Sequence, residues 1–87
     1  MNPPLDAVYT HRFERELAEL LPNARRADEF IRGAEWCLSR DPESGTQVVH
    51  STPVWYLPID EVVGATQVAV YYTFDAERVF FLSIRLA

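Results

Sequence analysis

The spacing of apolar and polar positions changes near residue 45, from a helical period to a strand-like one. Before that point, apolar residues recur every three or four positions, as they do on one face of an amphipathic helix. After it, short apolar runs rich in β-branched and aromatic residues are separated by polar turns, which is typical of strands. The pattern therefore predicts helices in the first half of the chain and a sheet in the second.

A short strand and a first helix are predicted at the N-terminal end. The apolar run AVYT follows a Pro-Pro pair and predicts a strand over residues 6–10. Thr10 can then cap a helix, because its hydroxyl can accept a hydrogen bond from a backbone N–H of the first turn. Apolar residues recur at helical spacing through HRFERELAELL until Pro22, which ends the helix. We expect residues 1–5 to be flexible.

A second helix is predicted to follow Asn23, which is a good capping residue. Trp36 lies off the centre of its apolar stripe, at the margin or outside it, and Cys37 is predicted to be a small core residue. The segment RDPESG, residues 40–45, stops the helix because proline cannot continue it and glycine permits a turn. The stripe itself contains Ala27, Phe30, Ile31, Ala34, Cys37 and Leu38.

The rest of the chain predicts strands. TQVVH (46–50) and PVWYLPI (53–59) are predicted as two short strands, and the prolines of the second favour an edge or irregular position. DEVVGA (60–65) is predicted as a loop. Two apolar strands, Gln67–Phe74 and Val79–Arg85, are predicted to form a terminal β-hairpin around the turn DAER.

The expected fold class is α+β, with the order β-α-α-β-β-β in one domain over residues 1–87. A two-helix hairpin packs on one face of a mainly antiparallel sheet. The terminal hairpin is apolar on both faces, so one face is expected to lie under the segment FIRGAEWCL of the second helix. The other face is where a partner would bind.

The register of the hairpin decides which polar side chains reach that second face. A turn around DAER that pairs Phe74 with Val79 puts Tyr72 on the same face as Arg85. A slip of one residue puts Tyr71 there instead, because successive side chains of a strand point to opposite faces.

Composition restricts the classes of function. The 87 residues carry a formal net charge of −5, which opposes a large nucleic-acid footprint, since phosphate binding needs a clustered basic surface. The one cysteine excludes an internal disulfide framework and a multi-cysteine metal site. No apolar run reaches the roughly 18 residues of a spanning helix, and no signal-peptide pattern is present. A cytoplasmic protein without cofactor or metal is expected.

Three stretches together resemble the RelE/ParE superfamily of type II toxin–antitoxin toxins. The first is the capped helix with Phe13, Leu17 and Leu20, and the second is LSRDPESG, which is similar to the Leu-x-x-x-Pro-x-x-Gly turn of family members. The third is VAVYYTFDAERVFFLSIR, a Tyr-containing strand with an acidic turn and a last strand that ends near a basic residue, Arg85. The resemblance covers nearly the whole chain.

The resemblance implies one of two activities. RelE-like members cut messenger RNA in the ribosomal A site, whereas ParE-like members poison DNA gyrase. Cutting requires a group that stabilises charge on the attacked phosphate, which suits arginine, and a group that moves the proton of a ribose 2′-hydroxyl. The candidate catalytic residues in this chain are Arg85, Tyr71, Tyr72 and His50.

Three features favour a gyrase-poison-like or degenerate member over an active messenger-RNA endoribonuclease. Gln67 stands where many members carry an arginine, and Leu86 and Ala87 follow Arg85 where many members carry a tail with His or Tyr. The overall charge is also acidic. The alternatives are a ribosome-dependent mRNA interferase and a non-toxic binding or dimerisation module of the same fold.

The expected partner is an antitoxin protein, bound as a peptide on the sheet face or edge. A homodimer through the same surfaces is an alternative. Gyrase, or the ribosome with its mRNA, is the expected cellular target, and no membrane is expected to take part.

Overall fold

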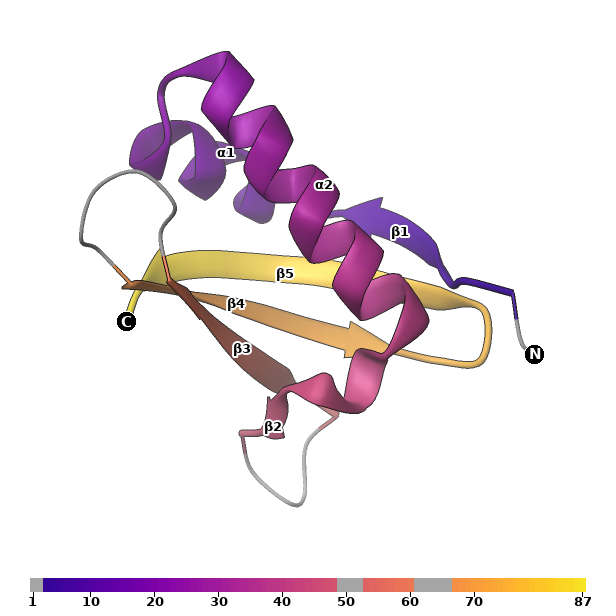
Figure 1. Ribbon diagram of the computed structural model, residues 1–87. Helices are drawn as coiled ribbons and strands as arrows, with labels where there is room; N and C mark the ends of the chain where they lie inside the picture. The colour runs from indigo at the N-terminus through magenta and orange to yellow at the C-terminus, as the bar shows by residue number, and fades with distance from the viewer. Residues whose placement is uncertain (1–2, 49–52, 61–66) are drawn as a thin grey trace.

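A hairpin of two helices packs against a five-stranded sheet in the computed structural model, which describes residues 3–48, 53–60 and 67–87 (Figure 1). Helix α1 spans His11–Leu20 and helix α2 spans Ala24–Arg40, followed by the short 3₁₀ helix η1, Pro42–Ser44. The strands are β1 Asp6–Tyr9, β2 Thr46–Gln47, β3 Trp55–Asp60, β4 Gln67–Phe74 and β5 Arg78–Leu86. This architecture confirms the predicted α+β fold.

The strands are arranged in the order β1-β5-β4-β3-β2. The pairings β2–β3, β3–β4 and β4–β5 are antiparallel, whereas β1 pairs with β5 in parallel. The sheet is therefore mainly antiparallel, as expected from the sequence, with a parallel pairing at β1. The parallel pair arises because the helical hairpin separates β1 from the rest of the sheet in the chain, as a crossover connection does. Within the terminal hairpin, Phe74 pairs with Val79, which is one of the two registers that the sequence left open.

Both helices begin at the expected capping residues. The Thr10 hydroxyl accepts a hydrogen bond from Phe13 N–H at 3.2 Å, and the Asn23 side chain accepts one from Arg26 N–H at 3.2 Å. Each bond satisfies a backbone donor that the first turn of a helix leaves unpaired. Before β1, Leu5 N–H donates to the Ser39 carbonyl at 2.8 Å, which joins the start of the sheet to the end of α2.

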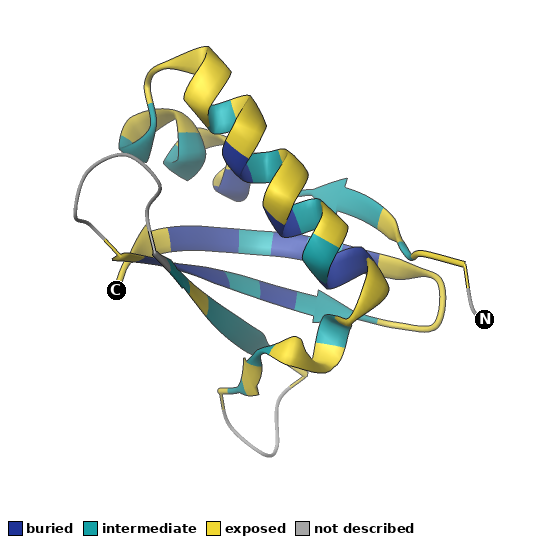
Figure 2. Cartoon of the chain, in the orientation of Figure 1, coloured by how far each residue is buried: buried dark blue, intermediate teal, exposed yellow. Residues whose placement is uncertain are grey.

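The core lies between α2, α1 and the terminal hairpin, where the dark blue segments of Figure 2 face one another. Trp36 lies on the outer side of α2 with 63% of its surface exposed, as its place off the stripe predicted. Cys37 is half-buried, with its Sγ 3.8 Å from Ser44 Oγ. The buried cluster contains Phe13, Phe30, Ala34, Leu38, Val68, Val70, Tyr72, Val79, Phe81 and Ile84. The expectation that one face of the hairpin lies under α2 is confirmed.

Parts of two predicted segments lie outside the described residues. They are residues 49 and 50 of the predicted strand TQVVH, and all of DEVVGA except Asp60, which ends β3. Within the described ranges, neither helix is long and apolar enough to cross a membrane.

Candidate functional site

A β-bulge in β5 decides which side chains reach the sheet face that α1 and α2 leave open. Tyr72 pairs with Phe81, but its neighbour Tyr71 pairs with Ser83, so Leu82 is an extra residue in β5. A bulge of this kind shifts the alternation of the strand by one position. Residues beyond it therefore point to the opposite face from the one that a regular strand would give.

The shift brings Arg85 to the face of Tyr71. Arg85 pairs with Ala69, two positions from Tyr71 on β4, whereas Ile84 pairs with Val70 in the core. A regular strand would have placed Arg85 on the face of Tyr72, as expected for this turn. The structure thus brings two of the predicted site residues together, Arg85 and Tyr71.

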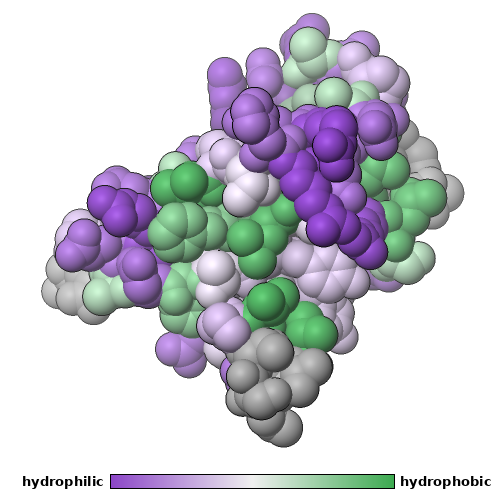
Figure 3. All heavy atoms as spheres, turned by 180° about the vertical axis from the view of Figure 1, so that it is seen from behind, coloured by the Kyte–Doolittle hydropathy of each residue, from purple (hydrophilic) through white to green (hydrophobic). Residues whose placement is uncertain are grey.

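Seen from behind, the sheet carries apolar surface that no helix covers in the described parts of the chain (Figure 3). Strand alternation places Val8, Phe80, Tyr71 and Tyr56 on this face, opposite the core residues beside them. All four are half-buried, and the rings of Tyr56 and Tyr71 lie 6.1 Å apart. We call this surface the open sheet face.

A hollow of about 320 Å³ lies at the border between the open sheet face and α1. Two cationic side chains, two apolar ones and two hydroxyls line it: Arg12, Arg85, Val54, Leu82, Tyr71 and Ser83. Arg12 comes from the first turn of α1, and the other five come from β4, β5 and the residue before β3. The hollow can therefore hold a ligand with an anionic group beside an apolar one.

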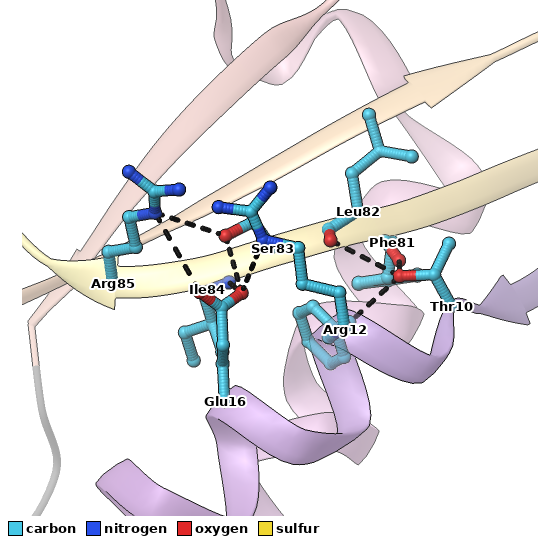
Figure 4. A network of polar contacts seen from close by, with 9 residues as sticks. Thr10, Arg12, Glu16, Phe81, Leu82, Ser83, Ile84 and Arg85 are labelled. Carbon is cyan, nitrogen blue, oxygen red and sulfur yellow. Dashed lines mark hydrogen bonds and ion pairs between the residues drawn. The ribbon is translucent and has the colours of Figure 1, made fainter.

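Glu16 of α1 joins this helix to the bulged strand, as Figure 4 shows. Its Oε1 accepts hydrogen bonds from the Ser83 hydroxyl at 2.6 Å and from Ile84 N–H at 3.4 Å. The guanidinium groups of Arg12 and Arg85 lie on either side of the same carboxylate, with Nε–O distances of 3.6 and 3.8 Å. Arg85 Nε also donates to Ser83 Oγ at 3.3 Å.

This environment lowers the pKa of Glu16. Desolvation by itself raises the pKa, but the hydrogen bonds from Ser83 and Ile84 and the positive charge of Arg12 together outweigh it. Glu16 is therefore ionised at neutral pH, and the two arginines with this one carboxylate carry a net charge of about +1.

Tyr72 lies apart from this hollow, inside the core. Its side chain is fully buried, and its hydroxyl donates to the Pro42 carbonyl at 2.6 Å and accepts from Gly45 N–H at 3.1 Å. Burial raises the pKa of Tyr72 to about 12. The hydroxyl is thus occupied in joining the turn after α2 to the sheet.

The remaining predicted site residue, His50, lies outside the described residues. Reasoning from the sequence missed Arg12, Glu16 and Ser83. Arg12 and Glu16 lie among interleaved basic and acidic residues of α1, and such a pattern is typical of a solvated helix face. One signal for them is present in β5. Regular alternation from Val79 would put Ser83 and Arg85 in the core, where polar residues without partners are unfavourable.

The described residues include no group of three or more His, Cys, Asp or Glu side chains placed to hold a metal ion. The hollow presents two guanidinium groups and two hydroxyls, with the Glu16 carboxylate beside them.

Comparisons with known proteins find similarity to solved structures. No protein-family model and no curated protein matches the sequence. Among solved structures, a chain of the toxin–antitoxin complex RelBE2 from Mycobacterium tuberculosis has a similar fold, with a TM-score of 0.75 and 20% sequence identity. The alignment covers 100% of this chain and 95% of that one. A likeness at this identity concerns the fold, and it confirms the RelE/ParE-like fold expected from the sequence.

Proposed function

We propose that this chain is a RelE/ParE-like toxin of a type II toxin–antitoxin system, and that it binds a cognate antitoxin segment on the open sheet face. The observation that carries the proposal is the uncovered, half-buried row of Val8, Phe80, Tyr71 and Tyr56 in a chain with the RelE-like fold. An apolar surface of this kind on a small domain marks a place where another chain packs. The similar structure from M. tuberculosis is itself a toxin–antitoxin complex.

Within this family we favour a gyrase-poison-like or degenerate member over an active messenger-RNA endoribonuclease. The Arg85 guanidinium, which would have to stabilise the attacked phosphate, lies 3.8 Å from the Glu16 carboxylate. The Tyr72 hydroxyl is hydrogen-bonded in the core. Of the candidate catalytic residues within the described ranges, Tyr71 and Arg85 are the ones that line the hollow. Two guanidinium groups that share the Glu16 carboxylate leave a net charge of about +1 at the hollow, which offers weak support for in-line cleavage of a phosphodiester.

Growth of cells that express the chain tests its role as a toxin. We expect induced expression alone to arrest growth, and co-expression with a reading frame that flanks its gene to relieve the arrest. Normal growth under strong induction of soluble, folded protein would contradict the proposal, and would favour the non-toxic binding or dimerisation module.

A ribosome-dependent cleavage assay tests the choice between activities. We expect no cleavage of messenger RNA by the wild-type chain beyond that of an R85A variant. Robust cleavage that disappears in R85A would overturn the preference for a gyrase-poison-like or degenerate member. The chain would then be identified as a ribosome-dependent mRNA interferase.

A further inference from the structure

The two arginines at the hollow are only loosely paired with Glu16. Both ion-pair distances, 3.6 Å for Arg12 and 3.8 Å for Arg85, are long for charge-assisted hydrogen bonds. The short contact of the carboxylate is with a neutral donor, the Ser83 hydroxyl at 2.6 Å. Glu16 is therefore held by β5, and among the described residues neither arginine has a bidentate partner.

The donors that remain point away from Glu16. A guanidinium has five N–H donors in a planar fork, and the contacts of both arginines with Glu16 involve Nε. Figure 4 shows the terminal nitrogens of Arg12 and Arg85 turned away from the carboxylate, and both side chains line the same hollow. The two side chains are 53% and 55% exposed. Both arginines can thus donate to one incoming anion.

The local charge suits a single carboxylate better than a polyanion. Two guanidinium groups and Glu16 leave a charge of about +1 at the hollow. The exposed Glu14 and Glu19 lie on the same helix, and the whole chain has a net charge of −5. A nucleic-acid backbone presents successive phosphates and needs an extended basic surface, whereas one acidic side chain is neutralised by this pair.

The rest of the hollow is suited to an apolar side chain. Val54 and Leu82 line it together with the ring of Tyr71. Because these groups lie beside the two guanidinium groups, an acidic residue and an apolar neighbour in one peptide can be recognised together.

We propose that Arg12 and Arg85 form a clamp for an aspartate or glutamate of the antitoxin segment, while an adjacent apolar residue enters the hollow. Glu16 is the fixed counter-ion that keeps the clamp in place. The inference rests on the proposed function, because it specifies the chemistry of the partner at the edge of the open sheet face.

A titration followed by nuclear magnetic resonance tests the clamp. The isotope-labelled chain is titrated with N-acetyl-Leu-Glu amide and with N-acetyl-Leu-Gln amide, which has the same shape without the charge. We expect the glutamate dipeptide to bind roughly tenfold more tightly, the difference made by charge-assisted hydrogen bonds. Its shifts should centre on the side-chain Nε–H signals of Arg12 and Arg85.

Variants then assign the effect to the clamp. R12Q and R85Q should each remove most of the preference for glutamate. R25Q is the matched control: Arg25 makes the same i,i+4 contact with Glu29, at 3.6 Å, but on α2 and outside the hollow. R25Q should leave both affinities unchanged. If R85Q unfolds, R85K keeps the charge without the planar fork and should give an intermediate affinity.

Three results would overturn the clamp. One is equal binding of the two dipeptides, and another is a glutamate preference that survives R12Q and R85Q. The third is tighter binding of uridine 3′-monophosphate than of the glutamate dipeptide, which would assign the hollow to a nucleic-acid backbone. These outcomes are independent of the growth assay: arrest with relief by a partner, but without a clamp, would leave the proposed function standing. If the titration shows the clamp but expression of the chain does not arrest growth, the clamp stands and the proposed role as a toxin is refuted.

Discussion

At the scale of single residues, Tyr72 and Gly45 explain why the turn after α2 has its sequence. The Tyr72 hydroxyl donates to the Pro42 carbonyl and accepts from Gly45 N–H. A Cβ on Gly45 would overlap the Tyr56 carbonyl oxygen and the Tyr72 hydroxyl. The Leu-x-x-x-Pro-x-x-Gly stretch therefore has a structural role in packing the end of α2 against the sheet. Its leucine fills the core, and its glycine permits the close approach of the sheet.

The Y72F substitution should lower the free energy of unfolding by about 1–2 kcal/mol, because the Pro42 carbonyl and the Gly45 N–H, both of half-buried residues, each lose their partner. Denaturant unfolding measures the effect. Y71F is the matched control, since no hydrogen bond of the Tyr71 hydroxyl is found among the described residues, and it should change stability by less than about 0.5 kcal/mol. Equal losses in the two variants would contradict the role of the Tyr72 hydroxyl.

Replacing Gly45 and Gly33 by alanine should change the stability of the chain in opposite directions. G45A should destabilise the chain by about 1–3 kcal/mol through overlap with the sheet. Gly33 is exposed within α2 and a Cβ there meets nothing within 4 Å, so G33A should stabilise it by about 0.5–1 kcal/mol through helix propensity. Thermal unfolding of the two variants checks the signs, and a stable G45A would show that the turn can shift.

At the scale of elements, α1 completes the edge of β5 where β1 ends. Strand β1 pairs with β5 as far as Tyr9, opposite Phe81. Beyond this point Thr10 supplies the contacts with β5. Its hydroxyl lies 3.0 Å from the Phe81 carbonyl oxygen and 3.2 Å from that of Leu82. One turn and a half later, Glu16 accepts from Ile84 N–H. The helix thus satisfies the backbone groups of a bulged strand that no neighbouring strand pairs.

The link between α1 and β5 makes stability depend on pH. Because the pKa of Glu16 is lowered in the folded chain, its ionised form contributes stability above the ordinary value of 4.5, and this contribution is lost as pH falls through the lowered pKa. E16Q should therefore lower the free energy of unfolding by about 1 kcal/mol at pH 7. Its difference from wild type should shrink below about pH 4.5.

Denaturant unfolding at several pH values measures this difference. E19Q is the control, because Glu19 lies on the exposed side of the same helix, and its stability should follow that of wild type throughout. An E16Q difference that is constant from pH 7 to pH 3 would show that the charge of Glu16 does not contribute.

At the scale of the whole molecule, two helices can cover one face of a sheet of five strands and leave the other open. The helical hairpin buries the core face (Figure 2), and apolar surface remains on the open sheet face (Figure 3). Phe80 is half-buried on that face. Within the described ranges, no helix lies on the open sheet face (Figure 3). This arrangement is the reason for placing the partner there.

Substitution of Phe80 tests that placement. F80Q should weaken binding of the partner that relieves growth arrest by about tenfold or more, because a buried aromatic contact is lost at the interface. Calorimetric titration measures the affinity. W36Q is the control, since Trp36 is a large exposed side chain on the outer face of α2, and it should leave the affinity unchanged. A greater loss in W36Q than in F80Q would place the partner on the helices.

The sequence by itself determined the elements and the fold class. Period, caps and turn residues are local properties, so the limits of both helices could be predicted, whereas the register of the terminal hairpin stayed open until the structure paired Phe74 with Val79. The site depended on tertiary structure. The bulge at Leu82 is stable because α1 supplies Thr10 and Glu16 to the strand edge, and this contact joins residues about 70 positions apart.

The same contact decided the roles of the polar candidates. It turned Arg85 to the open sheet face and brought Arg12 beside it, while Tyr72 stayed in the core as a structural hydroxyl. A local pattern reports which residues share a face of one element. Which elements then meet, and which charges come together, is set by packing between distant segments, and a pattern along the chain does not contain it.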